Sequence, residues 1–244
     1  MATLMKEFLE KNGRRFGFSY GIQRVAETAS RLQREPDAFV ASWLTEAENA
    51  IFLRMSVKKR RLEWLSGRIA SKNAFAQYMA ALNGNGTVPR ISVLNGPNRA
   101  PFIAEHPELS ISISHSYEYA VSVIAPFGIG VDIEKIEPRP PALVDYFFCR
   151  DERDFLTGDC HLPTQKDTMI TRFWSRKEAL SKFLQLGGKL LFRDINTIND
   201  HVWVGRVPRR VRLVTGNCDG YCISLALQDT KEKEHSERSQ FQVR

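Results

Sequence analysis

The stretch GIGVDIEKIE, residues 128–137, decides the fold of this chain because it combines a strand pattern with acidic side chains. Side chains alternate across a strand, so every second residue, here isoleucine or valine, is predicted to face a core. Asp132 and Glu134 then share the other face, about 7 Å apart. Two neighbouring carboxylates repel each other unless a cation lies between them. The stretch alone fits either a solvated acidic edge strand or half of a divalent-metal site.

Length and composition bound the class of protein. A chain of 244 residues forms one large domain or two small ones. The four cysteines form no CxxC pair, which indicates reduced, structural thiols in a cytoplasmic protein. No apolar run approaches the roughly 18 residues that span a bilayer, so no membrane association is expected. The first residues carry acids and lack an apolar segment, so they are not expected to be a signal peptide.

The positive charge of the chain is concentrated in its first part. The net charge is +7, and the first hundred residues contain 16 Lys and Arg against 8 Asp and Glu. The densest run is KKRR at residues 58–61. This excess indicates an anionic partner, which could be a nucleic acid, an acidic protein or a phosphorylated small molecule. A solvated helix face explains the same run without any partner.

Apolar periodicity and turn residues predict a mixed order of helices and strands. In chain order we expect weakly patterned helix over 1–35, helix over 42–82 with Gly67 as a break or close-packing point, a loop at 83–90, strand–turn–strand over 91–103, strands at 109–116, 119–125 and 128–137, helices at 141–157 and 166–186, and strands at 203–214 and 221–227. The three central strands are predicted to form an antiparallel meander, and 109–116 to be half-buried. The polar tail from Gln228 is predicted to be disordered.

A second informative stretch is FWSRKEALSKFLQLGG, residues 173–188. Its apolar residues form a helical stripe, and Gly187 and Gly188 predict the end of the helix. Glu178 and Lys182 are four residues apart and therefore share one helix face. They form an ordinary surface ion pair, or Glu178 is a third carboxylate for a metal and Lys182 faces an anionic substrate. Mg²⁺ prefers oxygen ligands and keeps positions open for phosphate and water.

These stretches, taken together with others, resemble the 4′-phosphopantetheinyl transferases of the surfactin/enterobactin type. The matching segments are KRRLEWLSGRIASKNAF (59–75), GPNRAPFI (96–103), SISISHSYEYAVSVIA (110–125), GVDIEKIE (130–137), FFCRDERDFL (147–156) and FWSRKEALSKFLQLGGKL (173–190). They cover about residues 54–195. The last three of these motifs, at that spacing after the Ser-His strand, are the specific ones, and the match at 59–75 is looser. Arg99-Ala100-Pro101 departs from the family's Gly-Lys-Pro.

The resemblance implies an α+β fold of two similar halves related by a pseudo-twofold, with the active site between them. We divide the chain at 1–125, a basic nucleotide-binding half, and 126–227, a half with the metal and catalytic motifs, followed by the tail at 228–244. The implied reaction transfers the 4′-phosphopantetheine arm of coenzyme A to a serine of a carrier protein and releases adenosine 3′,5′-bisphosphate. A monomer is implied, and an acidic acyl or peptidyl carrier protein is the implied partner. The fatty acid, polyketide and nonribosomal peptide pathways all remain open.

The resemblance also assigns roles to individual residues. Mg²⁺, or Mn²⁺, is expected on Asp132, Glu134 and Glu178. The residues expected to act in catalysis are Glu178, Lys182, His115 and Glu152, the last as a candidate to deprotonate the serine. The residues expected to contact coenzyme A are Arg60, Arg61, Arg68, Arg99, Ser114, His115, Lys177 and Lys182. One or two of the three arginines at 60, 61 and 68 are expected to hold the 3′-phosphate, and Trp174 is expected to pack in the core.

Three other readings of the sequence remain open. The basic first half fits a nucleic-acid-binding module, although its aromatic residues fall mostly inside apolar runs. A catalytically inactive scaffold that binds a carrier protein is the second, and the intact set of acids argues against it. A different Mg²⁺-dependent phosphoryl-transfer enzyme is the third.

Overall fold

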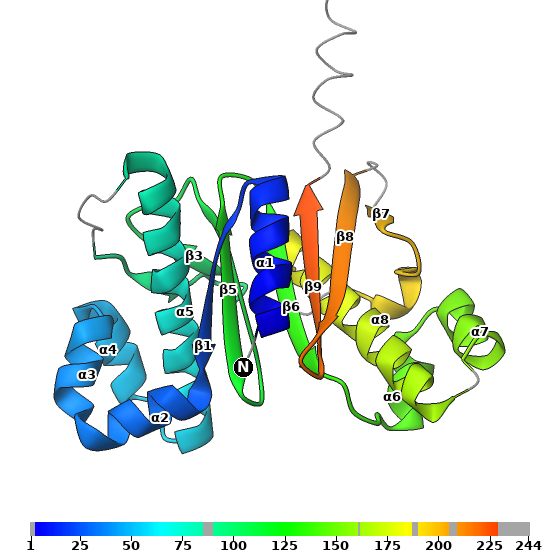
Figure 1. Cartoon of the computed structure of the whole chain (residues 1–244), viewed down its shortest axis with the longest axis horizontal. Coiled ribbons are helices and arrows are strands. Elements are labelled where there is room, and N and C mark those ends of the chain that lie inside the picture. The colour runs from blue at the N-terminus through cyan, green and yellow to red at the C-terminus, as the bar shows by residue number, and fades with distance from the viewer. Residues whose placement is uncertain (1–2, 85–89, 161, 187–189, 205–208, 229–244) are drawn as a thin grey trace, which may run out of the picture.

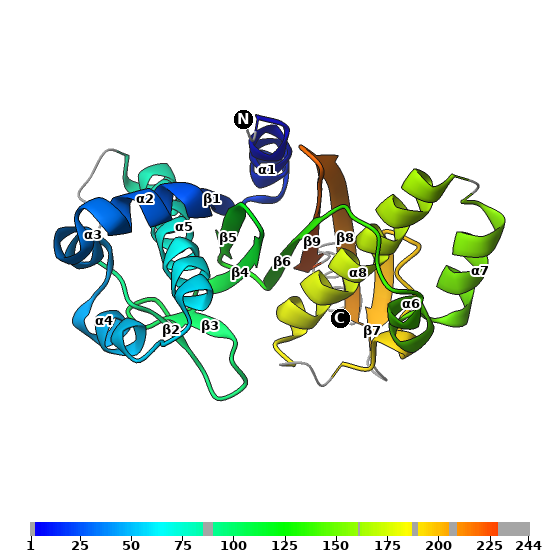
Figure 2. The same ribbon diagram turned by 90° about the horizontal axis from the view of Figure 1, so that it is seen from below.

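The computed structural model describes residues 3–84, 90–160, 162–186, 190–204 and 209–228. Two halves lie side by side, each with an antiparallel sheet and one long helix packed against it (Figures 1 and 2). This architecture confirms the predicted α+β class. None of the helices in the described ranges is long and apolar enough to cross a membrane. The predicted helix stop at Gly187 and the predicted tail beyond Gln228 lie outside the described residues.

The first half is built on a sheet with the strand order β1 (Ser19–Arg24), β5 (Tyr119–Ala125), β4 (Ser110–Ser116). Helix α5 (Lys58–Asn83) packs on β1 and β5. The approach is close because β1 contains Gly21: a Cβ there would lie 2.0 Å from the Ala70 carbonyl oxygen. Around this unit lie α2 (Val25–Arg34), α3 (Pro36–Trp43), α4 (Glu46–Leu53) and the hairpin of β2 (Val93–Asn95) and β3 (Pro101–Ile103).

The second half repeats this design. Its sheet has the order β6 (Ile129–Lys135), β9 (Tyr221–Gln228), β8 (Arg209–Cys218), β7 (His201–Val204), and α8 (Pro163–Leu184) packs on β6 and β9. A glycine again permits the contact, since a Cβ on Gly130 would lie 2.1 Å from the Ala179 carbonyl oxygen. The shorter elements are α6 (Pro141–Phe147), α7 (Arg150–Gly158) and the 3₁₀ turn η1 (Phe192–Asp194).

The first helix, α1 (Thr3–Phe16), lies against both halves (Figure 1). The Met5 backbone N–H donates to Asp219 at 3.3 Å in the second half, and Phe8 packs against Gly216 of β8. Met5 and Leu9 belong to one core cluster with residues of β5, β6 and β9. The predicted domain boundary at residue 125 therefore separates two sheets that share a core.

The two halves meet where β4 lies beside β6, and serine side chains make this seam. The hydroxyls of four alternate serines accept the backbone N–H groups of four alternate β6 residues at 3.0–3.3 Å: Ser110 from Ile129, Ser112 from Val131, Ser114 from Ile133 and Ser116 from Lys135. On the opposite face of β4, Ile111 and Ile113 pack in a core cluster with Ala74 and Phe75 of α5. Both faces of β4 are therefore occupied, and the predicted half-buried strand is buried on its polar face as well.

Several predicted elements differ from the structure. The predicted meander is wrong for its third strand, because β6 pairs with β9, and its backbone N–H groups on the β4 side donate to serine hydroxyls. The weakly helical stretch 1–35 contains strand β1, which pairs with β5. Helix α5 runs unbroken through Gly67, so the close-packing alternative is correct, and a Cβ there would lie 3.1 Å from Ile113. The helix predicted over 141–157 divides into α6 and α7 at Phe148, whose backbone is extended.

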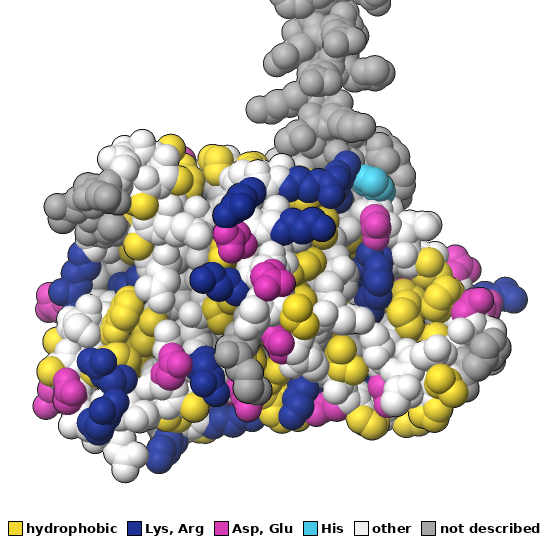
Figure 3. Space-filling model, viewed as in Figure 1, with side chains coloured by type: hydrophobic (Ala, Val, Ile, Leu, Met, Phe, Trp, Pro, Cys, Tyr) yellow, Lys and Arg dark blue, Asp and Glu magenta, His cyan; other side chains and the backbone are white. Residues whose placement is uncertain are grey.

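Charge on the face seen in Figure 1 is mixed. Lys and Arg side chains lie among Asp and Glu side chains there, without a continuous basic stripe (Figure 3). A nucleic-acid groove is expected to gather basic residues on one face or along one helix. This face does not favour the nucleic-acid alternative.

Candidate active site

Strand β6 presents its two acids as the alternation predicts. Its apolar residues Ile129, Val131 and Ile133 belong to the shared core, while Asp132 is buried and Glu134 half-buried. Asp132 Oδ1 accepts hydrogen bonds from Ser114 Oγ at 2.9 Å and from Lys182 Nζ at 2.7 Å. Asp132 Oδ2 is buried without a hydrogen-bond partner among the described residues. One carboxylate oxygen is therefore fixed by a cation and a hydroxyl, and the other is available.

Helix α8 supplies the third acid and the lysine. Glu178 and Lys182 line one hollow of about 310 Å³, together with Ser112 and Arg99 of the first half. The ammonium of Lys182 pairs with Asp132 and also donates to Ser114 Oγ at 2.9 Å. Burial raises the pKa of Glu178, and the negative charges of Asp132 and Glu134 raise it further, whereas Lys182 lowers it. The i, i+4 spacing thus places both side chains at one hollow, but Lys182 forms its ion pair with Asp132 of β6 and not with Glu178.

Glu134 is held by two groups that the sequence analysis did not assign to the site. Its Oε2 accepts a hydrogen bond from Arg139 at 2.9 Å, and its Oε1 accepts one from the indole N–H of Trp174 at 3.2 Å. Burial and the charge of Asp132 raise the pKa of Glu134, and Arg139 lowers it. Trp174 also packs edge-on against the ring of Phe147, so the expected core role is only part of its function.

The three acids fit a hard divalent cation by their chemistry, although they are not drawn together. All three predicted ligands are carboxylates, which Mg²⁺ and Mn²⁺ prefer. The buried, unpartnered Oδ2 of Asp132 is the atom that such a cation would satisfy. Within the described residues, no three His, Cys, Asp or Glu side chains stand in a metal-binding arrangement. The engagement of Glu134 by Arg139 and Trp174 is consistent with this.

A second, basic hollow of about 500 Å³ adjoins the first. Arg99, Pro101 and Ile113 line both of them. Among the residues lining the basic hollow are Arg60, Arg68 and His115. Burial lowers the pKa of the His115 imidazole, and the charge of Glu63 opposes this effect. The two hollows together bring basic groups of the first half next to the acids and the lysine of the second.

The three candidate arginines of α5 separate in the structure. Arg60 and Arg68 line the basic hollow, whereas Arg61 lines a different one near α2 and α4 and stacks on Phe52 at 4.3 Å. The prediction that Arg61 contacts the nucleotide is therefore not supported by its position, because consecutive helical residues point about 100° apart. Arg68 stacks on Trp64 at 4.3 Å and is 4% exposed, and burial lowers its pKa to about 10.

Arg99 lies at the tip of the β2–β3 hairpin in a left-handed backbone conformation with φ of 63°. Asn95 fixes this tip, because its Nδ2 donates to the Arg99 carbonyl at 2.7 Å and its Oδ1 accepts from Arg68 at 2.7 Å. Asn98 donates to the Gln185 carbonyl at 2.6 Å and so links the tip to the end of α8. Sequence reasoning assigned no role to Asn95 or Asn98, although both lie in the predicted strand–turn–strand segment 91–103.

Two predicted site residues, Glu152 and Lys177, do not reach either hollow. Both side chains are fully buried and form an ion pair of 2.9 Å. Lys177 also donates to the carbonyls of Phe192, at 2.7 Å, and Ile195. The positions of the two side chains therefore do not support the predictions that Glu152 deprotonates the serine and that Lys177 contacts coenzyme A, because neither side chain lines a hollow. Lys177 points away from its neighbour Glu178 by the same helical geometry.

The first half contains an equivalent buried pair that sequence reasoning missed. Glu48 is fully buried, and its Oε2 accepts from Lys72 at 2.7 Å. Glu48 also closes a capping box with Thr45 at the start of α4 and accepts the Val93 N–H at 3.0 Å. The Thr-x-x-Glu spacing ahead of an apolar run is the signal that could have located the start of this helix.

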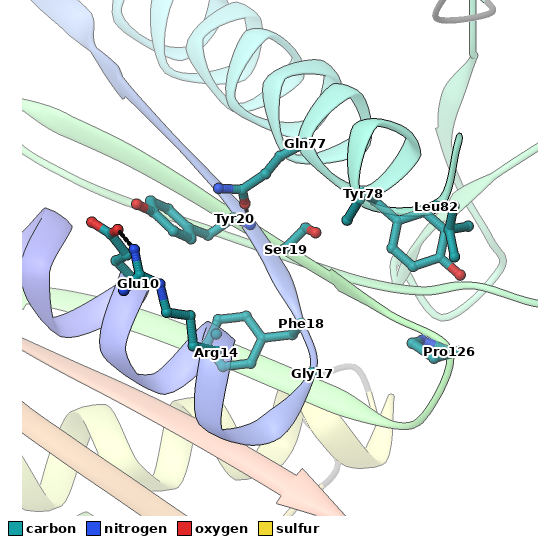
Figure 4. Close-up of a pocket in the computed structure, with 12 residues that line it drawn as sticks. Glu10, Arg14, Gly17, Phe18, Ser19, Tyr20, Gln77, Tyr78, Leu82 and Pro126 are labelled. Atoms are coloured by element: carbon teal, nitrogen blue, oxygen red, sulfur yellow. Dashed lines mark hydrogen bonds and ion pairs between the residues drawn. The ribbon is translucent and has the colours of Figure 1, made fainter. Parts of the chain in front are cut away.

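The structure contains a further hollow of about 530 Å³ between α1, β1 and the end of α5, remote from these residues (Figure 4). Its wall includes Tyr20, Tyr78 and Leu82, and its charged groups are the paired Glu10 and Arg14. None of the predicted site residues lines it. Cavity size alone therefore does not locate the chemistry of this protein.

Comparison with known proteins adds independent information. A family model for the 4′-phosphopantetheinyl transferase superfamily matches residues 128–235, and one for the 4′-phosphopantetheinyl transferase N-terminal domain matches residues 47–125. A holo-[acyl-carrier-protein] synthase of Geobacillus sp. (strain WCH70) is 31% identical over 102 residues, which are 40% of this chain and 85% of that protein. The synthase of Streptococcus pyogenes serotype M28 (strain MGAS6180) is 37% identical over 106 residues, 42% of this chain and 88% of that protein.

Among solved structures, the holo-(acyl-carrier-protein) synthase from Bacillus anthracis str. Ames, in complex with CoA (3′,5′-ADP), is 27% identical with a TM-score of 0.36. The match covers 44% of this chain and 91% of that one. The family models and the sequence relatives agree with each other and with the motifs around Asp132 and Glu178. The chain belongs to the 4′-phosphopantetheinyl transferase superfamily.

Proposed function

We propose that this enzyme transfers the 4′-phosphopantetheine group of coenzyme A to a serine hydroxyl of a carrier protein and releases adenosine 3′,5′-bisphosphate. The observation that carries this proposal is the pair of adjoining hollows, one basic and one with Glu178 and Lys182. Coenzyme A has a 3′-phosphate on its nucleotide and a pyrophosphate next to the arm that is transferred. Adjacent anion-binding and phosphoryl-transfer sites match that order of groups.

The position of each side chain in the two hollows suggests its role. We place the 3′-phosphate near Arg60 and His115 in the basic hollow, and the pyrophosphate beside Arg99, which lines both hollows. Lys182 supplies positive charge where the bond to the nucleotide breaks. Phosphoryl transfer depends mainly on such positioning and charge stabilisation. With Glu152 buried, Glu178 is the remaining predicted acid that lines the hollow and could accept the serine proton.

We propose Mg²⁺, or Mn²⁺, as the metal, held by Asp132, Glu134 and Glu178. The orphaned Asp132 Oδ2 and the shared negative charge of the three acids support this assignment. When bound, the ion would neutralise negative charge on the pyrophosphate. Glu134 would have to exchange or share its contact with Arg139.

The test is a direct assay of transfer. The purified protein is incubated with coenzyme A, Mg²⁺ and an apo carrier protein, and the carrier is weighed by mass spectrometry. The expected result is a mass increase equal to one phosphopantetheine group, which disappears when EDTA is added. If none of several acyl and peptidyl carrier proteins gains mass, the proposed function is overturned.

The two-half design supports the finer assignment to the surfactin/enterobactin type. The 102 residues matched in the Geobacillus protein are 85% of it but 40% of this chain, so that relative is about half as long. This chain adds a first half that the N-terminal-domain model matches. Because one chain contributes both walls of the cleft, we propose that the enzyme acts as a monomer. An acidic carrier protein would suit the excess of Lys and Arg in the first hundred residues.

A further inference from the structure

The serine seam between β4 and β6 contains one member with an additional function. Each of its four serines accepts one backbone N–H from β6, which fixes the relative position of the two strands. Ser110 accepts the Ile129 N–H in this way, and it lines neither of the two hollows. Ser114, in contrast, also contacts two predicted site residues.

The hydrogen bonds of Ser114 use its whole capacity. A hydroxyl group has one donor and two acceptor positions. Ser114 Oγ donates to Asp132 Oδ1 at 2.9 Å, and it accepts from the Ile133 N–H at 3.2 Å and from Lys182 Nζ at 2.9 Å. No donor or acceptor position remains for a phosphate or a hydroxyl of a ligand.

The location of Ser114 agrees with this count. The side chain is 5% exposed and lines neither the acid-containing hollow nor the basic one, although its neighbours Ile113 and His115 do. The resemblance to the family implied a contact between Ser114 and coenzyme A. The geometry instead places Ser114 behind the residues that would make such contacts.

We propose that Ser114 is a positioning residue, which fixes the Asp132 carboxylate and the Lys182 ammonium relative to each other and does not contact coenzyme A. The inference rests on the proposed function, since it assigns Ser114 a role in the same reaction. Because Asp132 lies on β6, Lys182 on α8 and Ser114 on β4, one hydroxyl ties together three elements from both halves. A misplacement of about 1 Å in such a site costs about 100-fold in rate.

The kinetic test compares Ser114→Ala with Ser110→Ala, which removes a rung of the same seam without touching the site. We expect Ser114→Ala to lower kcat by about 10- to 100-fold with KM for coenzyme A unchanged. Ser110→Ala is expected to keep both constants, and Ser114→Thr, which retains the hydroxyl, is expected to restore most of kcat. A raised KM for coenzyme A with kcat retained would show a ligand contact and overturn the proposal. So would an equal loss of kcat in Ser110→Ala.

A second readout needs no turnover. The rate at which an acetylating reagent modifies Lys182 is measured by mass spectrometry, with the exposed Lys59 as the internal reference. Loss of one hydrogen bond should speed the modification of Lys182 about two- to tenfold in Ser114→Ala and leave it unchanged in Ser110→Ala. An unchanged rate in Ser114→Ala would overturn the positioning role. If the wild-type enzyme fails to modify a carrier, the proposed function fails, while this measurement still decides whether Ser114 holds Lys182.

Discussion

Replacing Lys177 with methionine should destabilise the protein without changing its chemistry. The Lys177 ammonium has three protons and three partners: the Glu152 carboxylate and the carbonyls of Phe192 and Ile195. Glu152 in turn accepts the Cys149 N–H, at 3.1 Å, and the N–H of Thr197, at 2.9 Å. Methionine fills a similar volume but leaves the Glu152 charge buried and unpaired.

The magnitude follows from that burial. Removing one member of a buried ion pair costs about 3–5 kcal/mol of unfolding free energy, because the other charge remains without compensation. For chains of this size, 1 kcal/mol corresponds to about 2–4 °C in Tm. Lys177→Met should therefore lower Tm by about 6–20 °C. A comparison change on the side of the same helix that faces the hollow, Lys182→Met, should lower kcat by about 100-fold or more.

The assay combines urea unfolding with steady-state kinetics at a temperature where every variant is folded. We expect Lys177→Met to keep kcat and KM for coenzyme A there, and Glu152→Gln to behave likewise. The double variant should cost less than the sum of the two single changes, since neither charge is then left alone. A Lys177→Met protein with unchanged Tm and greatly reduced kcat would refute this reasoning and return Lys177 to the active site.

Three other predictions follow from the site. Asp132→Asn should abolish measurable carrier modification while far-UV circular dichroism stays unchanged; normal turnover would exclude it as a metal ligand. Arg139→Gln should tighten Mn²⁺ binding by about 3- to 10-fold in titration calorimetry, because the guanidinium no longer competes for Glu134; weaker binding would show that Arg139 prepares the site instead. Arg60→Gln should reduce the preference for coenzyme A over its 3′-dephospho form, and the matched Arg61→Gln should not, since Arg60 lines the basic hollow and Arg61 lines a different one; the reverse result would place the 3′-phosphate near Arg61.

Strand periodicity predicted the acid face of β6 because alternation is a local property. The core position of Val131 and the opposite position of Asp132 follow from the period of two, whatever the partner strand is. The pairing partner was not predictable in the same way. A strand at 119–125 followed by a short turn favours a hairpin, but here serine hydroxyls of β4 take the N–H groups of β6, and β9, nearly a hundred residues later, forms the ladder.

The motif that contains Glu178 and Lys182 predicted only part of the site. The spacing of Glu178 and Lys182 placed both at one hollow, as the helical period requires. The same motif does not tell which of its charged residues face the hollow and which face the core, because the two adjacent residues Lys177 and Glu178 carry equally polar side chains. Lys177 faces the core because it pairs there with Glu152, a buried acid on α7. This contact joins two different helices, so the local motif does not reveal it.

The buried ion pairs are a feature that the two halves share. In each half the third residue of a short helix is a glutamate that closes a capping box: Glu48 in α4 and Glu152 in α7. In each half that glutamate accepts a backbone N–H from the residue 45 positions later: Val93 for Glu48 and Thr197 for Glu152. In each half a lysine of the long helix forms an ion pair with that glutamate: Lys72 with Glu48 and Lys177 with Glu152.

A buried charge pair of this kind tolerates the loss of neither partner, so it joins the short helix, the long helix and the segment that donates the backbone N–H. The surrounding apolar residues are under weaker constraint, because hydrophobic residues of similar volume can replace one another. In the second half, the helix that this pair anchors also carries Glu178, one residue beyond the anchoring lysine. The Lys177–Glu152 pair therefore stabilises the same helix from which the next residue, Glu178, reaches the hollow.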